Sequence, residues 1–392
     1  MSNTQVKQIL GQAFLDIAKG IETGSFKKKA RIGLTLLGSE HGLENMVKGA
    51  ALAARSADYD IVLIGPAVDA PFEQVLADSE EAQHKKMEEL LDSGALDACV
   101  TLHYSFPIGV STVGKVITPG QGTEMFLATT TGTSATNRTE AMFKNAVYGI
   151  IAAKAMGIAE PTVGILNVDN ARTVERALRE LNDNGYPVHF GGSMRSDGGA
   201  VMRGNDLLTG SVDVMVTDTL TGNLLMKMFS SYATGGSYEA TGYGYGPGIG
   251  DDYHRSILIL SRASGVPVVA GALDYAAGLV RGNLKAVAAR EFKAVKEAGF
   301  ERILQGFNKA QEKSCDEAVV TAPPKEVVTG TISGIDIMDL DSAVQALWKG
   351  GIYAESGMGC TGPIVMVSEA RLEAAMAVLA QAGYVAKPAD IC

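Results

Sequence analysis

The chain has 392 residues, of which 46% are apolar and 20% are charged, and its formal net charge is −10. This composition excludes an intrinsically disordered chain and supplies enough apolar residues for a large core. The acidic balance gives no overall attraction to nucleic acid or to an anionic membrane surface, and no stretch is long and apolar enough to span a membrane. We therefore expect a globular protein of two or three domains with no nucleic acid or membrane partner.

The beginning of the chain and its cysteines bear on where the protein works. Residues 1–30 lack the basic-then-apolar order of a secretion signal and are predicted to form an amphipathic helix that ends in a lysine run. The four cysteines, at positions 99, 315, 360 and 392, show no short paired spacing. In a chain without an export signal, such cysteines are expected to be reduced thiols. We therefore expect a cytoplasmic protein.

From residue 31 short apolar runs alternate with helical stretches, a pattern typical of parallel α/β layers. Strands are predicted over residues 31–37, 60–66 and 98–103, with a charged helix over about 79–93. Cys99 falls within the third of these strands, so we expect it in the core. The Gly/Thr-rich stretch 119–136 is predicted to be a loop, and its length indicates a functional one.

The alternation continues to about residue 313. Helices are predicted over residues 137–156, 171–185 and 284–299 and into Lys313, with strands over 162–168 and 212–218. The run GYGYGPGIG at 242–250 fits no register of the dinucleotide fingerprint GxGxxG, and Pro247 interrupts it. We therefore predict that this run is a mobile or backbone-exposing loop.

Pro323 and Pro324 mark the best candidate linker, because two prolines prevent a helix from continuing and favour an extended segment. The chain is therefore predicted to divide into a body, residues 1–320, and a small C-terminal α/β module, residues 325–392. The predicted order within the module is strand, helix, strand, a loop with the sequence GMGCTGP, strand and helix.

Two familiar kinds of site find little support. GVSTVGKV at 109–116 is close to a phosphate-binding P-loop, but Val116 stands where Ser or Thr would hold magnesium. The five histidines, at positions 41, 84, 103, 189 and 254, show no ligand spacing. We therefore predict neither a P-loop nor a metal site.

Three turns at predicted strand ends carry more information. Ser39 and His41 lie in a glycine-flanked turn that is either an anion site or an ordinary helix start. Residues 217–223, TDTLTGN, combine hydroxyls, an amide and a helix N-terminus, which suits a phosphate or a carbonyl oxygen. Arg262 lies among the hydroxyls of SRAS, so its guanidinium either pairs with an acid or faces a ligand.

Cys360 is the cysteine with the most distinctive surroundings. Glycines at 357, 359 and 362 could leave backbone N–H groups free to stabilise an oxyanion, but no histidine lies near in sequence to lower the pKa of the thiol. The residues alone leave a nucleophile and a buried small side chain equally open. Cys315 and Cys392 are expected to be peripheral.

The body resembles two acyl-phosphate families. LLGSEHGLENMVKGAALAA, NAVYGIIAAKAMGIAEPTVGILNV and NDLLTGSVDVMVTDTLTGNLLMK follow the phosphate acyltransferase of phospholipid synthesis, and GPGIGDDYHRSILILSRASG resembles a segment of phosphotransacetylase. The resemblance covers about residues 30–310. It implies a two-lobed α/β/α sandwich of the phosphate acyltransferase and isopropylmalate dehydrogenase-like type, with an acyl-phosphate site in the cleft. Neither family has the C-terminal module.

The whole chain, module included, is similar to the alpha subunit of component C of the glycine, sarcosine and betaine reductase complexes. That resemblance implies that a carboxymethyl group on the selenocysteine of selenoprotein A is released as acetyl phosphate, with a thiolase-like beta subunit as partner. It places the active thiol on Cys360 and implies a cytoplasmic oligomer. Which amine donor the complex serves does not follow from this chain.

The resemblance implies a mechanism that we state as a hypothesis. The acetyl group becomes a thioester on Cys360, phosphate attacks its carbonyl, and N–H groups at Gly359, Thr361 and Gly362 stabilise the oxyanion. The residues expected to hold phosphate are Thr221, Gly222, Asn223, Ser261 and Arg262. Ser39, His41 and Asp218 are expected to line the same cleft. No cofactor or metal is predicted, because orthophosphate is itself a substrate.

Two alternatives stay open. The first is a stand-alone phosphate acyltransferase or phosphotransacetylase that uses coenzyme A or an acyl carrier protein and works without Cys360. The second is a non-catalytic scaffold that keeps the fold and docks the beta subunit.

Overall fold

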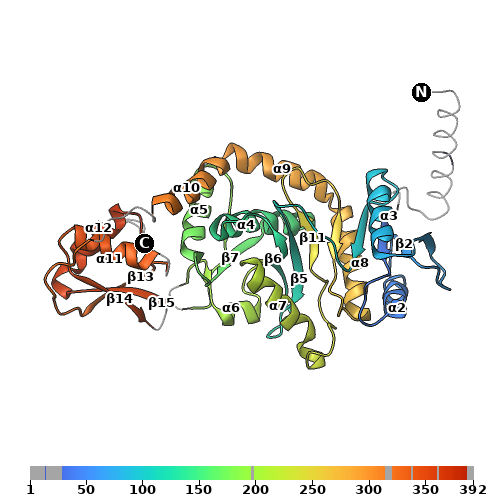
Figure 1. Cartoon of the computed structure of the whole chain (residues 1–392), viewed down its shortest axis with the longest axis horizontal. Coiled ribbons are helices and arrows are strands. Elements are labelled where there is room, and N and C mark those ends of the chain that lie inside the picture. Colours follow the sequence, from blue (N-terminus) through green and yellow to red (C-terminus); the bar gives the residue numbers. More distant parts are fainter. Residues whose placement is uncertain are drawn as a thin grey trace.

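A 12-stranded sheet runs through the larger part of the protein, in the order β3-β2-β1-β4-β12-β11-β5-β6-β10-β7-β8, with β9 paired to β7. The computed structural model describes residues 29–195, 198–313, 320–336, 339–359 and 362–385, together with Phe14. Helices cover both faces of the sheet, and a smaller unit follows at the C-terminal end (Figure 1). The predicted mixed α/β class is therefore confirmed.

Parallel strands form the first half of the sheet. They are β1 (Arg31–Thr35), β2 (Asp60–Gly65), β3 (Glu73–Leu76), β4 (Ala98–Thr101) and β12 (Ile257–Ile259). Their apolar runs are continuous because α2 (Leu43–Ala53) and α8 (Val266–Arg281) cover one face and α3 (Glu80–Asp92) covers the other. Cys99 is fully buried in β4, as predicted.

The second half of the sheet holds the remaining strands. They are β5 (Val110–Ile117), β6 (Glu124–Thr133), β7 (Thr162–Leu166), β8 (His189–Phe190), β9 (Val201–Met202), β10 (Val214–Val216) and β11 (Gly246–Ile249). Its helices are α4 (Arg138–Ala155), α5 (Ala171–Asp183), α6 (Gly204–Thr209), α7 (Thr219–Ser231), α9 (Leu284–Glu297) and α10 (Phe300–Lys313). Figure 1 shows α4, α5, α9 and α10 toward one face and α6 and α7 toward the other.

Two predictions of loops were wrong, and both fall on the centre of the sheet. Most of the stretch 119–136 forms β6, because its β-branched threonines suit a strand and Thr129 and Thr130 are fully buried there. The second half of GYGYGPGIG forms β11, which pairs antiparallel with both β5 and β12. A Cβ on Gly246, whose φ is +82°, would lie 1.7 Å from the Val113 carbonyl oxygen, so only glycine permits this approach.

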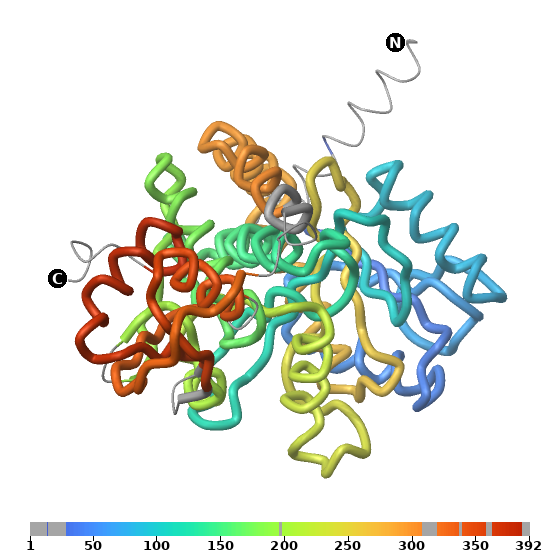
Figure 2. Tube along the Cα trace, turned by 60° about the vertical axis from the view of Figure 1, so that its left-hand side comes forward, coloured from blue at the N-terminus to red at the C-terminus, as the bar shows by residue number. Residues whose placement is uncertain are grey.

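The C-terminal module has a sheet and a core of its own. Its antiparallel strands, in the order β13-β15-β14, are β13 (Gly330–Ser333), β14 (Ala354–Gly359) and β15 (Gly362–Val367), and its helices are α11 (Leu340–Lys349) and α12 (Leu372–Gln381). Val344, Leu347 and Val365 are in its core. Figures 1 and 2 show the module beside the half of the body that carries α5. The boundaries at 320 and 325 stay a prediction.

The two strands around the predicted cysteine loop extend further into it than expected. β14 and β15 stay paired up to Gly359 and Gly362, so the strands take up most of the glycine-rich sequence. Cys360 and Thr361 lie outside the described residues. Among the residues that the structure describes, every helix is too short or too polar to cross a membrane.

Candidate functional site

The predicted phosphate turn follows β10 and opens α7. Asp218 is the N-cap residue, and its carboxylate accepts hydrogen bonds from the Thr221 backbone N–H (3.1 Å) and from the Thr221 hydroxyl (2.6 Å). The Arg138 guanidinium bridges Asp218 (3.0 Å) and Asp169 (2.9 Å). The structure therefore brings together Asp218 and Thr221, and it adds a guanidinium that the sequence analysis missed.

The charge of Asp218 changes how this turn can receive an anion. Burial alone would raise the pKa of Asp218, but hydrogen bonds from Thr221 and the adjacent Arg138 lower it. Asp218 is therefore ionised at neutral pH, and its negative charge already interacts with the N-terminus of α7. A phosphate near this turn would have to rely on Arg138 and on hydroxyl groups. The hydroxyl of the fully buried Thr217 has no hydrogen-bond partner in the described part of the chain.

Gly222 and Asn223 fasten α7 to the sheet. A Cβ on Gly222 would lie 1.8 Å from the carbonyl oxygen of Thr129, so α7 can approach β6 only because residue 222 is glycine. The Asn223 side chain donates a hydrogen bond to the carbonyl oxygen of Thr130 at 3.0 Å. Gly222 and Asn223, two of the predicted phosphate ligands, are thus already engaged in contacts with β6.

The Ser-Arg turn follows β12 and meets the turn that follows β1. The Glu40 backbone N–H donates to the Arg262 carbonyl oxygen (2.9 Å), and the His41 ring lies 3.2 Å from the Ala263 carbonyl oxygen. Ser39, which accepts from the His41 N–H, belongs to the same group. The guanidinium of Arg262 pairs with Glu80 at 3.2 Å and is half-exposed. Of the two alternatives for this arginine, pairing with an acid is the one found.

Glu239 is a buried acid of this region that the sequence analysis missed. Only 2% of the residue is exposed, and its carboxylate accepts hydrogen bonds from the hydroxyls of Ser264 (2.9 Å) and Tyr245 (3.3 Å). Burial raises its pKa, although these bonds, one with Ser261 and the charge of Lys227 act in the opposite direction. The sequence feature that could have indicated Glu239 is its position as the only acid in a run rich in glycine and tyrosine, SYEATGYGYG.

A series of hydrogen bonds, buried except for the one from Asn223, joins the two turns. Asn223 donates to the Thr130 carbonyl, and the Thr130 hydroxyl donates to the Tyr245 carbonyl at 2.7 Å. The Tyr245 hydroxyl donates to Glu239, which also accepts from Ser264. No direct side-chain contact between the turns occurs in the described ranges. The predicted phosphate residues therefore lie at the two ends of one polar network.

Replacing Glu239 with Gln is expected to remove a pH-dependent loss of stability. A carboxyl whose pKa is raised by folding holds its proton more tightly in the native state, so stability falls as pH rises above the ordinary value of 4.5. The amide that replaces the carboxyl in Glu239→Gln cannot ionise. Urea unfolding from pH 4 to 8 should show the wild-type free energy of unfolding falling relative to that of the variant as pH rises. Parallel curves would contradict the buried, titrating carboxyl.

The thiols divide into those that the structure describes and those that it does not. Cys99 is fully buried, and burial raises the pKa of its thiol, which makes it a poor nucleophile. Gly359 and Gly362 face each other across β14 and β15 at the end of the paired strands. Cys360 and Thr361, between them in sequence, are outside the described residues, so their predicted roles stay predictions.

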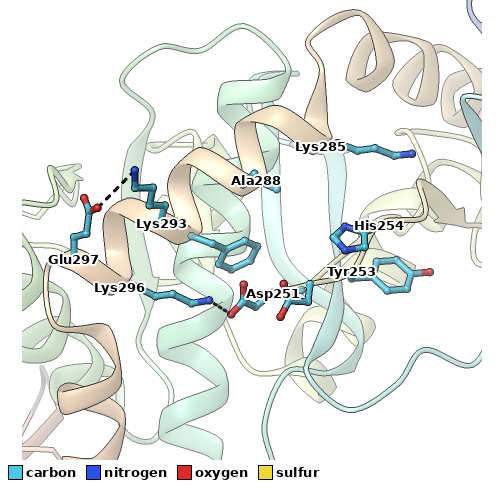
Figure 3. A pocket seen from close by; sticks show the side chains of 12 residues that line it. Asp251, Tyr253, His254, Lys285, Ala288, Lys293, Lys296 and Glu297 are labelled. Atoms are coloured by element: carbon cyan, nitrogen blue, oxygen red, sulfur yellow. Dashed lines mark ion pairs between the residues drawn. The ribbon is translucent and has the colours of Figure 1, made fainter.

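A separate pocket of about 420 Å³ lies between α9 and the loop after β11 (Figure 3). Its lysines are largely balanced by acids, because Lys296 pairs with Asp251 and Lys293 pairs with Glu297. None of the residues predicted to act on acetyl or phosphate lines it. Within the described residues, no group of three His, Cys, Asp or Glu side chains is arranged to hold a metal ion.

Comparison with known proteins gives relatives for the whole chain and for the body alone. A family model described as "Fatty acid synthesis protein" matches residues 30–366. The glycine/sarcosine/betaine reductase complex component C subunit alpha of Peptoclostridium acidaminophilum is 66% identical over 384 residues, which are 98% of this chain and 100% of the relative. A phosphate acyltransferase of Thermotoga petrophila is 26% identical over 240 residues, covering 52% of this chain and 69% of the relative.

One solved structure similar to this chain is a branched-chain phosphotransacylase from Enterococcus faecalis. The TM-score is 0.46 and the sequence identity is 16%, over 64% of this chain and 99% of that one.

Proposed function

We propose a function from the premise that the chain belongs to the family of the component C alpha subunit of the glycine, sarcosine and betaine reductase complexes, and to the fatty acid synthesis protein family. The chain carries an acetyl group as a thioester on Cys360 and transfers it to phosphate, which yields acetyl phosphate. One observation carries this proposal. The component C relative matches the module as well as the body, whereas the phosphate acyltransferase matches about half of the chain.

The chemistry needs one bond to form and one to break. A phosphate oxygen attacks the thioester carbonyl, the carbonyl oxygen becomes an oxyanion, and the carbon–sulfur bond then breaks to leave a thiolate on Cys360. Backbone N–H groups at Gly359, Thr361 and Gly362 stabilise the oxyanion in this proposal. A thioester suits the step because its thiolate is a good leaving group and no metal is required to polarise the carbonyl.

Phosphate is held, in this proposal, between the two turns. Thr221, Gly222 and Asn223 provide one side, and Ser261 and Arg262 provide the other. The supporting observations are the Arg138 guanidinium beside the start of α7 and the hydroxyl of Thr217, which has no hydrogen-bond partner in the described part of the chain. The turn that contains Ser39 and His41 holds the Ser-Arg turn in place, because Glu40 and His41 form hydrogen bonds with the carbonyl oxygens of residues 262 and 263.

The partners in this proposal follow from the origin of the acetyl group. Selenoprotein A supplies the carboxymethyl carbon, and a thiolase-like beta subunit of component C processes it before transfer. The complex works as an oligomer in the cytoplasm, and the alpha subunit uses orthophosphate without a further cofactor.

A trapping experiment tests the acyl acceptor. Protein incubated with [14C]acetyl phosphate and quenched in acid should carry label on the peptide that contains Cys360, and neutral hydroxylamine should release it. Cys360→Ser and Cys392→Ala are the matched variants, of which only the second should keep a hydroxylamine-sensitive label. Label on another residue, or none, contradicts the proposal.

A second candidate function is phosphate acyl transfer that uses coenzyme A or an acyl carrier protein, favoured by the 26% identity of the body to a phosphate acyltransferase. That reaction would not need Cys360. Exchange of acetyl between phosphate and coenzyme A by the Cys360→Ala variant would support it. Absence of both activities, with the partners assembled, would favour a non-catalytic scaffold.

A further inference from the structure

The C-terminal module meets the body through acidic side chains and one helix end. The backbone N–H of Asn170, at the start of α5, donates to the Asp336 carboxylate at 3.1 Å. Further along α5, the Thr173 hydroxyl lies 3.5 Å from the Asp339 carboxylate, and about one turn beyond it the Arg176 guanidinium pairs with the same carboxylate at 3.0 Å. Both acids come from the segment that connects β13 to α11.

These contacts cap the N-terminus of α5, which has no capping side chain of its own. Asn170 has a φ of 69°, its side chain makes no capping hydrogen bond, and the first turn of α5 contains no acid. No side chain of the first turn accepts from the N-terminus of α5, and Asp336, 166 residues away and 4% exposed, does so instead. The fit is one of charge and hydrogen bonding.

Apolar packing contributes little to this contact. The buried apolar residues of the module, from Ile332 to Leu379, form a cluster with one another and with no described core residue of the body. A contact made of a few polar groups can open and close without unfolding either part. The module can therefore leave its place on α5 as a unit.

The contact lies next to the predicted phosphate turn. Asp169 directly precedes Asn170, and Arg138 joins Asp169 to Asp218, the N-cap residue of α7. A change in the position of the module at Asn170 is thus one residue from an ion pair that reaches Asp218. Figure 2 shows the module beside this half of the body.

We propose that Asp336 and Asp339 are positioning residues that dock the module on α5, next to the ion pair that reaches the phosphate turn, and that acetyl phosphate formation depends on this docking. This inference rests on the proposed function. Docking is reversible, so acetyl phosphate forms when the two acids are bound to α5 and its formation slows when they are not.

Charge reversal and charge exchange test the docking in the full-length chain. Arg176→Glu and Asp339→Arg should each increase amide hydrogen exchange at the first turn of α5 and lower acetyl phosphate formation by about 100-fold. The double variant should recover both to within about threefold. Arg179→Glu, which alters an arginine of the same helix that pairs with Glu175 instead, should change neither.

The far-UV circular dichroism spectrum gives a readout that a folding defect would change. It should stay unchanged in all four variants, because the module keeps its own core. Unchanged hydrogen exchange in both single variants would overturn the docking, whatever the fate of the proposed function. Increased exchange with undiminished acetyl phosphate formation would overturn the positioning role. Failure of the proposed function is recognised separately, by retained activity of Cys360→Ala.

Discussion

Replacing Cys360 with Ala is expected to lower acetyl phosphate formation by at least about 1,000-fold, as removal of a covalent nucleophile does in other enzymes. Without the thiol the acetyl group has no acceptor on this chain, and phosphate has no thioester to attack. The measurement is the rate of acetyl phosphate release by the alpha subunit assembled with its purified partners. Far-UV circular dichroism and urea unfolding should match those of the unchanged chain.

Two variants make this result specific. Cys392→Ala removes another thiol outside the described residues and should keep full activity, which separates the role of Cys360 from a general need for reduced cysteines. Cys360→Ser keeps the size of the side chain but forms a poorer leaving group, so any ester that forms should release acetyl slowly. Full activity of Cys360→Ala would remove the thioester from the mechanism.

The sequence predicted three strands of the first half of the sheet well because they obey local rules. β1, β2 and β4 are short apolar runs. Two helices have N-cap residues, Ser79 and Asn137, whose side chains each accept a hydrogen bond from the backbone N–H three residues further on. Such capping and burial patterns are visible within a dozen residues. These predicted elements therefore match the structure closely, whereas the edge strand β3 was not predicted.

The centre of the sheet could not be predicted in the same way. β6 and β11 are rich in threonine and glycine, which in isolation are typical of loops. They form strands because β5 lies between them and supplies hydrogen bonds on both sides, from more than 100 residues away in the case of β11. Gly246 has no local signal of its role, since the group it avoids is the carbonyl of Val113.

The candidate site shows the same division between local and distant information. The turns at 217–223 and 261–265 were predicted from local composition, and both occur at strand ends, as expected for an α/β sheet. Their contacts could not be foreseen, because the partners of Asn223 and Arg262 are Thr130 and Glu80. Glu239 was missed for the same reason, since Ser264, whose hydroxyl donates a hydrogen bond to it, lies 25 residues further along the chain.

The network between the turns gives the two halves of the sheet a shared polar element. The carboxyl group of Glu239 accepts from hydroxyls beside the Ser-Arg turn, and Thr130 holds Asn223 at the other turn. Because Thr130, Tyr245, Glu239 and Ser264 are buried, loss of one of them leaves a neighbour without a partner at a cost of about 1–3 kcal/mol. A substitution at either turn is therefore expected to disturb the other, and Gly222 offers the sharpest test.

Replacing Gly222 with Ala is expected to destabilise the protein by about 2–3 kcal/mol and to raise the KM for phosphate. The added Cβ would lie 1.8 Å from the Thr129 carbonyl oxygen, so α7 must move away from β6. That movement lengthens the hydrogen bond from Asn223 to Thr130 and displaces Thr221 from Asp218. The measurements are the free energy of urea unfolding and the phosphate dependence of acetyl phosphate formation.

Whether Gly222→Ala lowers or raises the free energy of unfolding distinguishes a steric clash from the usual gain in helix propensity. Alanine in place of a helical glycine ordinarily stabilises by up to about 1 kcal/mol, because glycine loses more backbone freedom on folding. Gly306→Ala, in α10, is the matched control, since nothing lies within 4 Å of the added Cβ, and it should stabilise. If Gly222→Ala also stabilised the protein, α7 would not depend on the close approach to β6, and the phosphate turn would be set by other contacts.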